Sequence, residues 1–557
     1  MSRKYVLGLD FGTESGRALL VATDNGEELA TAVMNYPHGV IDHELPGTGK
    51  RLDPEWALQH PQDYLGVMEA VVKEAVAKSG VRGEDIVGIG VDFTACTMMP
   101  IDAANTPLCL KDEFKANPSA WVKLWKHHAS QPEADRINEV AAARGETFLA
   151  RYGGKVSSEW FFPKALQTLN EAPEVYAAAD RFIEAGDWIV LQLTGIEKRN
   201  ACAAGYKGMW DGSFPSKEFL RVLDPRFENI VAEKMRTDIV PTGTRVGNLL
   251  PEIAKRLGLR PDTAVAAAGI DAHVAVPGAS VTGPGKMVMI MGTSLCHMVN
   301  STSGAPIAGT SGVVRDGILP GYFGYEAGQS AVGDIFAWFV KSCVPGAITD
   351  LAKQQNTDVH GLLSCKAAGL KPGESGVLCL DWWNGNRSVL ENADLSGLMV
   401  GMTLTTQPHE LYRAVLESTA FGTYKIIETL DQGGCRVDEL FACGGLSVNA
   451  PFLMQIFADV TNREIKVAAS DQTVALGSAM WGAVAAGKSA GGHDSISAAA
   501  KSMARLRDKS YKPDPAAHAV YAKLYAEYER LHDHFGRGGH DVMKTLKALK
   551  RSARGKA

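Results

Sequence analysis

Two similar hairpins, about half the chain apart, constrain the fold of this 557-residue protein more than any other feature. In residues 5–21 and again in residues 286–299, an apolar strand turns sharply through a glycine and a threonine into a second strand. The turn residues are Gly12 and Thr13 in the first hairpin, and Gly292 and Thr293 in the second. Either turn alone would be read as an ordinary hairpin, but glycine also lets a backbone approach a phosphate closely. Their repetition 280 positions apart predicts a duplicated domain that holds one nucleotide between its two copies.

The length of the chain also favours two domains, because a single hydrophobic core stops growing at about 250 to 300 residues. A short apolar run, residues 264–271, opens the second half of the sequence. We therefore place the boundary at residue 268, with a first domain over 1–268 and a second over 269–557.

The composition indicates a globular protein with a small-molecule partner. Charged residues make up 22% of the chain and the net charge is −6, so we expect no basic surface for nucleic acid or for a membrane. The longest apolar run, residues 474–487, is shorter than the ~18 to 20 residues that span a bilayer. The N-terminus does not resemble a secretory signal, and we expect a cytoplasmic location.

The cysteines and histidines form no recognisable disulfide or metal pattern. Nine cysteines are spread without a Cys-x-x-Cys pair, which argues against a disulfide framework and a zinc ribbon. His127 and His128 are adjacent, whereas a helical metal site places two histidines four positions apart. We expect reduced, mostly buried thiols and no histidine-based metal site.

Apolar periodicity and turn signals place helices and strands in a similar order in both halves. The first half is expected to contain a strand over 28–34, a helix over 61–78, a buried strand over 86–92 and mainly helical structure over 117–200. The second half is expected to contain a hairpin extending to 314, a helix over 331–343, a strand over 376–380 and a helix over 408–430. Antiparallel strands followed by a helix and a parallel strand predict an α/β sheet in each half. The basic stretch 544–556 is interpreted as a solvated tail.

A glycine pair in the second half predicts a further nucleotide contact. The strand over 439–443 breaks at Gly444 and Gly445, and a helix is expected over 452–459. Glycine permits close backbone approach, and the free N–H groups of a helix N-terminus favour an anion. Asn449 and Gln455 would then lie near the base of the nucleotide, although a helix cap and an exposed helix face would also explain them.

Residues 482–489 match the Gly-x4-Gly-Lys-Ser pattern of a P-loop, but we interpret the match as false. A true P-loop follows a strand and opens a helix. Here residues 474–486 have a helical pattern and Gly487 suits its C-terminal cap, so Lys488 would follow a helix. A P-loop enzyme that uses Lys488 stays open as an alternative.

In their order and spacing, the motifs resemble those of the FGGY family of carbohydrate kinases over about residues 5–490. These motifs are the two glycine-threonine hairpins, the turn over 268–273, the Gly444-Gly445 loop and the run 397–417. The resemblance implies a duplicated actin-like ATPase fold, a ribonuclease H-like α/β architecture with a cleft between its domains. The segments similar to those of members that phosphorylate L-ribulose are 91–100, 124–128, 205–210 and 324–329. Glu14 departs from the family pattern, since many relatives carry threonine or serine there.

The residues around the two turns suit phosphates and a metal ion. Backbone N–H groups and threonine hydroxyls can hold phosphate oxygens, and Arg17 can add positive charge. Asp10 ends a buried strand beside the first turn, where a carboxylate suits Mg²⁺, although an Asx turn would also explain it.

The resemblance also implies the roles on the acceptor side. Asp271 would be the general base that takes the hydroxyl proton, and its place at the start of a helix would keep it ionised. A helix-capping role alone would also explain an aspartate there. The sugar ligands would be the backbone at Ala95 and the side chains of Lys207, Asp271 and Glu326. Asp92 and Lys126 are weaker candidates nearby.

The resemblance therefore implies an ATP- and Mg²⁺-dependent kinase that converts L-ribulose to L-ribulose 5-phosphate in arabinose catabolism. The first domain would bind the sugar, the second would bind the nucleotide, and the protein would be a homodimer. Two alternatives stay open: a kinase for D-ribulose, xylulose or ribitol, and a non-catalytic actin-like protein that senses sugar and nucleotide. An aspartate at position 271 favours an enzyme, since a sensor needs no base.

Overall fold

The first sheet begins as the predicted antiparallel meander. In the computed structural model, which describes residues 3–553, its strands lie in the order β11 (Arg245–Asn248), β12 (Ala264–Ala266), β5 (Ile86–Phe93), β1 (Tyr5–Phe11), β2 (Ser15–Ala22) and β3 (Glu28–Asn35). Strand β1 is antiparallel to β2 and parallel to β5, and α1 (Pro61–Ser79) packs on β2 and β3. The predicted strands and helix of this region are confirmed, each one residue longer than expected.

The second sheet repeats five strands of the first in the same order, and each sheet has one further edge strand that the other lacks. Its order is β16 (Gly312–Arg315), β17 (Phe323–Gln329), β15 (Leu295–Ser301), β14 (Lys286–Met291), β20 (Glu439–Cys443) and β21 (Ile465–Val467). Strand β14 is antiparallel to β15 and parallel to β20, as β1 is to β2 and β5. Strands β17 and β21 then take the places of β3 and β12. The duplication predicted from the two hairpins is confirmed.

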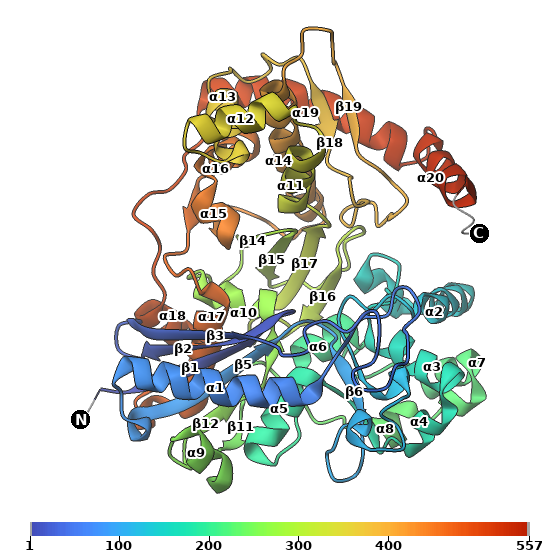
Figure 1. The fold of residues 1–557 in the computed structure, drawn as a ribbon, viewed down its shortest axis with the longest axis vertical. Coiled ribbons are helices and arrows are strands. Elements are labelled where there is room, and N and C mark those ends of the chain that lie inside the picture. The colour runs from blue at the N-terminus through green and yellow to red at the C-terminus, as the bar shows by residue number, and fades with distance from the viewer. Residues whose placement is uncertain (1–2, 554–557) are drawn as a thin grey trace.

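Six helices of the second half lie on the side of the second sheet that faces away from the first half (Figure 1). They are α11 (Gly333–Ser342), α12 (Gly346–Gln354), α13 (Val359–Ala368), α14 (Pro408–Gln432), α15 (Gly445–Asn449) and α16 (Pro451–Thr461). The helices predicted over 331–343, 408–430 and 452–459 are confirmed. The strand predicted over 376–380 is β18 (Leu378–Leu380), which pairs with β19 (Leu398–Val400) in a separate small sheet.

A mostly helical region with its own hydrophobic core is attached to the first sheet (Figure 1). Its helices are α2 (Gln131–Arg144), α3 (Phe161–Glu171), α4 (Pro173–Ala178), α7 (Lys217–Leu223) and α8 (Ile230–Lys234). The neighbouring α5 (Ala185–Thr194) packs on β5 of the first sheet, and α6 (Ala201–Lys207) packs on β16 of the second. The predicted helical character of residues 117–200 is confirmed, and the short strands β4 (Leu58–Gln59), β6 (Met98–Ile101), β7 (Val122–Lys123) and β8 (Arg181–Glu184) add a small sheet.

Helix α17 (Thr473–Ala486) belongs to the second half of the sequence but packs on β1 and β5 of the first sheet (Figure 1). The helix can approach the sheet closely because Gly90 of β5 faces it. A Cβ at Gly90 would collide with the carbonyl oxygen of Ser478 on α17. Helix α10 (Asp271–Gly278) packs along α17. The domain boundary at residue 268 stays a prediction, because α17 comes after it in the sequence but packs on the sheet of the first half.

The same helix bears out our interpretation of the P-loop match. Residues 482–486 lie inside α17, which ends at Gly487 with a positive φ of 74°, and Lys488 follows in a short 3-10 turn. The segment therefore caps a helix instead of forming a loop between a strand and a helix.

The C-terminal stretch is a helix over most of its length. After α19 (Pro515–Gly536), the chain forms α20 (Val542–Ala553), in which Met543 is buried and Lys547 donates to the carbonyl oxygen of Leu395 at 3.0 Å. The predicted solvated character is confirmed for residues 544–553, which are exposed apart from the half-buried Lys547, although they form a helix that Lys547 fastens to the body of the protein. Residues 554–556 of the predicted tail lie outside the described part of the chain.

Within residues 3–553, no single helix is both long and apolar enough to cross a bilayer, and α11 and α12 reach the length only as a pair bent by 104°. The nine cysteines are all free and six of them are buried, as expected.

Candidate active site between the two halves

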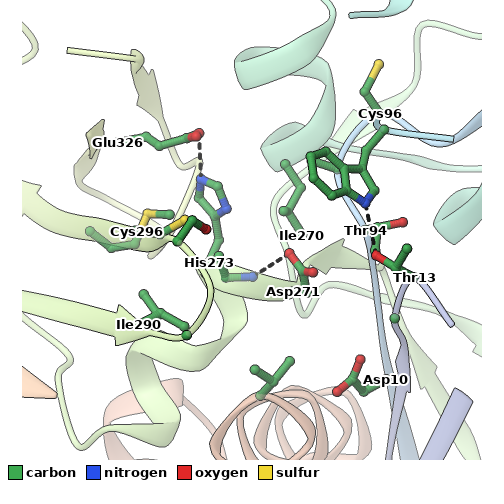
Figure 2. A pocket seen from close by; sticks show the side chains of 18 of the residues that line it. Asp10, Thr13, Thr94, Cys96, Ile270, Asp271, His273, Ile290, Cys296 and Glu326 are labelled. Atoms are coloured by element: carbon green, nitrogen blue, oxygen red, sulfur yellow. Dashed lines mark hydrogen bonds and ion pairs between the residues drawn. The ribbon is translucent and has the colours of Figure 1, made fainter. Parts of the chain in front are cut away.

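A cavity of about 380 Å³ lies where the two halves meet (Figure 2). The predicted residues that line it are Asp10, Gly12, Thr13, Arg17, Ala95 and Lys207 from the first half, and Asp271, Gly292, Thr293 and Glu326 from the second. They stand on β1, β2 and β17, on the turns that follow β1 and β14, on the loop after β5, at the end of α6 and at the start of α10. The duplicated fold thus brings together residues that are far apart in the sequence.

The two glycine-threonine turns are built alike. The N–H of Gly12 donates to the carbonyl oxygen of Ser15, and the N–H of Gly292 donates to that of Ser294, each at 3.0 Å. These glycine N–H groups are therefore used inside the turns, which leaves the threonines as the phosphate donors we expect. The hydroxyl of Thr13 accepts a hydrogen bond from Trp125 Nε1 at 3.0 Å, so its own proton is free for a ligand (Figure 2).

Two carboxylates lie side by side where β1 and β5 end. Asp10 and Asp92 are register partners, and Asp92 is fully buried and accepts a hydrogen bond from Ser478 Oγ at 2.6 Å. Burial raises the pKa of both carboxyl groups, and the neighbouring Asp10 raises that of Asp92 further. One oxygen of Asp92 has no hydrogen-bond partner among the described residues. Such a pair fits a hard divalent cation, with Asp10 in the cavity and Asp92 behind it.

Arg17 lines the cavity but its guanidinium is turned toward Asp10, with Nε 3.3 Å from Oδ2. In this arrangement the positive charge of Arg17 compensates the negative charge of the Asp10 carboxylate. A contact between Arg17 and phosphate stays a prediction.

Asp271 is the first residue of α10, and its carboxylate accepts a hydrogen bond from the N–H of Ala272 at 2.7 Å. Burial nevertheless raises the pKa of Asp271 to about 7 against the effect of that hydrogen bond, and the charges of Asp10 and Glu326 add to the rise. Our expectation that the helix N-terminus keeps this carboxylate ionised is therefore wrong, since the group titrates near neutral pH. A pKa near 7 suits a general base.

A buried ion pair joins the two halves across the cavity. Lys207 Nζ at the end of α6 lies 3.1 Å from Glu326 Oε2 on β17, and His273 Nε2 lies 3.5 Å from the same oxygen. Burial alone would raise the pKa of Glu326, but Lys207 and His273 outweigh it and hold the pKa far below its usual range. A charged, donor- and acceptor-rich wall of this kind suits the hydroxyl groups of a sugar.

Several cavity-lining residues were missed at the level of sequence. They are Thr94, Cys96, Trp125, Glu159, His273, Cys296 and Arg387. Thr94, Cys96 and Trp125 lie in segments whose family resemblance could have indicated them. Glu159 and Arg387 lie in irregular loops, where no periodicity or motif marks a position.

A second cavity, of about 650 Å³, begins beside the second glycine-threonine turn. Gly333 lines it and donates its N–H to the carbonyl oxygen of Gly292 at 3.2 Å, and Asn449 lines it farther along. Gly444 lies at the end of β20 with φ 89°, where a Cβ would lie 2.5 Å from the carbonyl oxygen of Met291. Gly444 and its neighbour Gly445 line neither cavity, but Gly444 packs against the strand that leads into the second turn.

Other sequence candidates lie elsewhere. Gln455 lines neither of these two cavities, and its side-chain amide donates to Asp459 Oδ1 and to the carbonyl oxygen of Lys512, each at 2.8 Å, so its place near the base stays a prediction. Glu14 is exposed, and Lys126 lines a different cavity.

One histidine cluster brings metal-ligating atoms within 4.8 Å of one another, at His38, His60 and Asp63. The two imidazole rings are stacked at 4.5 Å and 13°, and both oxygens of Asp63 accept hydrogen bonds from His38. Since a metal ion lies in the plane of each imidazole that binds it, parallel stacked rings are poorly placed to share one.

The sequence matches two family models over most of its length. Residues 5–278 match the N-terminal domain and residues 287–486 match the C-terminal domain of the FGGY family of carbohydrate kinases. A protein named ribulokinase from Geobacillus thermodenitrificans is 57% identical over 557 residues, which cover 100% of this chain and 98% of that protein. A ribulokinase from Mycolicibacterium smegmatis is 48% identical over 99% of this chain and 97% of its own.

Solved structures show the same fold at low sequence identity. The xylulose kinase of Rhodospirillum rubrum superposes with a TM-score of 0.79 at 23% identity, covering 95% of this chain and 98% of its own. The gluconate kinase of Lactobacillus acidophilus gives a TM-score of 0.79 at 19% identity, covering 96% and 99%. The duplicated actin-like ATPase fold implied by the sequence motifs is confirmed.

Proposed function

The chain belongs to the FGGY family of carbohydrate kinases, and from that membership we propose that it phosphorylates L-ribulose with ATP to give L-ribulose 5-phosphate. Full-length relatives at 48 to 57% identity carry the name ribulokinase, which supports this acceptor. The observation that carries the proposal is the position of Asp271, which faces a cavity bounded by two glycine-threonine turns and by the Lys207–Glu326 pair.

The proposed reaction uses each wall of the cavity differently. Thr13 and Thr293 would hold the phosphates of ATP, and Asn449 would lie near the adenine in the second cavity. Mg²⁺ at Asp10 would neutralise charge on the phosphate oxygens when bound. Lys207, Glu326 and the backbone at Ala95 would orient the sugar so that its terminal hydroxyl reaches Asp271.

In this scheme Asp271 accepts the proton of the sugar hydroxyl as that oxygen attacks the γ-phosphate. The first domain would bind the sugar and the second the nucleotide. Closure of the two halves would bring acceptor and donor together and exclude water, which limits the hydrolysis of ATP.

The pKa of Asp271 predicts how activity depends on pH. The base must be ionised to accept a proton, and the ionised form dominates only above a pKa of about 7. We expect kcat/KM for the sugar to fall about tenfold per pH unit below that value and to level off above it. A coupled ADP-release assay from about pH 5.5 to about pH 9 measures this, and a profile that is flat through pH 7 would contradict the assignment.

Lys488 provides a test of the P-loop alternative. It lies after α17, and it does not line either of the two cavities described above. We expect Lys488→Ala to leave the KM for ATP within about twofold of wild type, because a residue without ligand contact contributes little binding energy. A large loss of nucleotide binding, measured by titration calorimetry, would instead favour the P-loop.

The acceptor is tested by comparing kcat/KM for L-ribulose, D-ribulose, L-xylulose, D-xylulose and ribitol. We expect L-ribulose to give the highest value. Preference for one of the others would keep the kinase and change the sugar, whereas ATP consumption that needs no sugar would favour the sensor. A homodimer in a cytoplasmic location is part of the proposal through the family resemblance, and light scattering tests the assembly.

A further inference from the structure

A buried lysine links two segments that line the candidate active site. Lys164 on α3 is 0% exposed, and its ammonium group donates to the carbonyl oxygens of Cys96 at 2.7 Å and Leu124 at 2.8 Å. No carboxylate within residues 3–553 lies within ion-pair distance of it, and burial lowers its pKa. Glu184 and Glu159 compensate this charge only from beyond ion-pair distance, and a buried charge without a direct partner is costly, so the hydrogen bonds that it makes must matter to the fold or to the site.

Both of these carbonyl groups adjoin residues of the proposed ligand site. Cys96 follows Ala95, whose backbone we place at the sugar, and Leu124 precedes Trp125, whose indole donates to the Thr13 hydroxyl at 3.0 Å. Thr13 belongs to the first phosphate turn. One ammonium group therefore connects the loop at the sugar with a side chain that contacts the turn at the phosphates.

The loop at the sugar is held from outside at its two ends, where the N–H of Thr94 donates to the carbonyl oxygen of Phe11 at 3.2 Å and the N–H of Ala185 donates to that of Thr97 at 2.6 Å, and Lys164 holds its middle. Cys96 has a φ of 47°, in the left-handed region that a non-glycine residue adopts at a cost. Within the loop, the hydroxyls of Thr94 and Thr97 lie 2.8 Å apart, but this contact does not reach the segment that carries Trp125. Backbone pairing of Met98 with Lys123 joins the two segments at one point, and Lys164 adds a second connection at the carbonyl groups next to the cavity-lining residues.

We propose that Lys164 is a positioning residue for phosphoryl transfer, which holds the sugar-binding loop at a fixed distance from the phosphate turn. The inference rests on the proposed function, because it takes the loop at Ala95 as a sugar contact. Without the ammonium group the buried carbonyl oxygen of Cys96 loses its donor and that of Leu124 keeps only the N–H of His127, so the loop can shift. A displacement of about 1 Å at a reacting group can cost about 10²-fold in rate.

Lys123 offers a matched control in the same cluster. It is 1% exposed, and its ammonium group donates to the carbonyl oxygen of Lys164 at 3.0 Å, to Gln167 Oε1 at 2.8 Å and to Thr168 Oγ1 at 2.9 Å. All three acceptors belong to α3, and none of them lines the cavity. Lys123 thus shares the residue type and the burial of Lys164 but makes no hydrogen bond to the sugar loop.

The test compares Lys164→Met with Lys123→Met by steady-state kinetics at a temperature well below the melting point of both. For Lys164→Met we expect the KM for L-ribulose to rise at least tenfold and kcat to fall, with the KM for ATP within about threefold of wild type. The KM for ATP changes little because Thr13 is held independently by Gln59 Nε2, which donates to its carbonyl oxygen at 2.7 Å. For Lys123→Met we expect similar thermal destabilisation but sugar and ATP KM values both within about threefold.

Lys164→Gln keeps amide N–H donors on a shorter side chain, so its sugar KM is expected to lie between wild type and Lys164→Met. If Lys164→Met does not fold, the comparison of Lys164→Gln with Lys123→Met carries the test. Equal rises in sugar KM for the variants at 164 and 123, or equal rises in the KM for sugar and ATP at 164, would overturn the inference. Failure of the wild-type protein to phosphorylate any ketopentose would instead refute the proposed function.

Discussion

Replacing Asp271 with asparagine is expected to lower kcat by about 10³-fold. Asparagine has nearly the same shape as aspartate but cannot accept the proton of the sugar hydroxyl. A positioned general base contributes about 10² to 10⁴ in rate, and no second carboxylate in the cavity is placed as Asp271 is, at the start of α10 between the two turns. The measurement is single-turnover phosphoryl transfer with saturating sugar and ATP.

The same variant separates catalysis from binding. Sugar binding, followed by calorimetry, should change by less than about tenfold, because asparagine still offers hydrogen-bonding groups to a hydroxyl. The residual activity should also lose the pH dependence centred on the Asp271 pKa of about 7. A folded Asp271→Asn protein with turnover near that of wild type would contradict the assignment of the base.

Replacing Lys207 with methionine should lower kcat/KM for the sugar by about 10²-fold and destabilise the protein by about 3 to 5 kcal/mol. Lys207 and Glu326 form a buried pair at 3.1 Å, and removal of one partner leaves the other charge uncompensated. His273, 3.5 Å from Glu326, can offset part of this charge only when protonated, and burial lowers its pKa. Denaturant unfolding measures the stability, and the coupled assay measures the activity.

The double variant Lys207→Met with Glu326→Gln distinguishes the two effects. Without the unpaired carboxylate, stability should return to within about 2 kcal/mol of wild type, since replacement of a whole buried pair is often nearly neutral. Activity should stay low if the two side chains bind the sugar. Recovery of stability and activity together would show that the pair serves the fold alone.

The architecture could be predicted from the sequence because it depends on local patterns. The hairpins around Gly12 and Gly292 reflect alternation and turn chemistry, and their recurrence reflects duplication. The resulting order of five strands is the same in both sheets. The crossing of α17 onto the first sheet was not predicted, since it depends on a close approach at Gly90 that no periodicity encodes.

Only part of the candidate site could be predicted from the sequence. The family resemblance placed Asp271, Lys207 and Glu326, and the fold brings all three to one cavity. The ionisation of Asp271 was misjudged, because burial is a property of the folded chain and it outweighs the helix terminus. Glu159 and Arg387 were missed because irregular loops bring them to the cavity.

The proposed role of Lys164 could not be predicted from the sequence, because it depends on contacts that only the folded chain makes. In the sequence it is one lysine in an apolar helix, and only the folded chain places its ammonium group on the carbonyl oxygens of Cys96 and Leu124.

The central claim is that this cavity transfers phosphate from ATP to the terminal hydroxyl of L-ribulose. Phosphorus NMR of a reaction that contains the protein, Mg²⁺, ATP and L-ribulose tests it most directly. We predict one new phosphomonoester signal, coupled to the protons on C5 of the sugar and formed in equal amount to ADP. Release of ADP with inorganic phosphate alone, or no reaction with L-ribulose, would contradict the account.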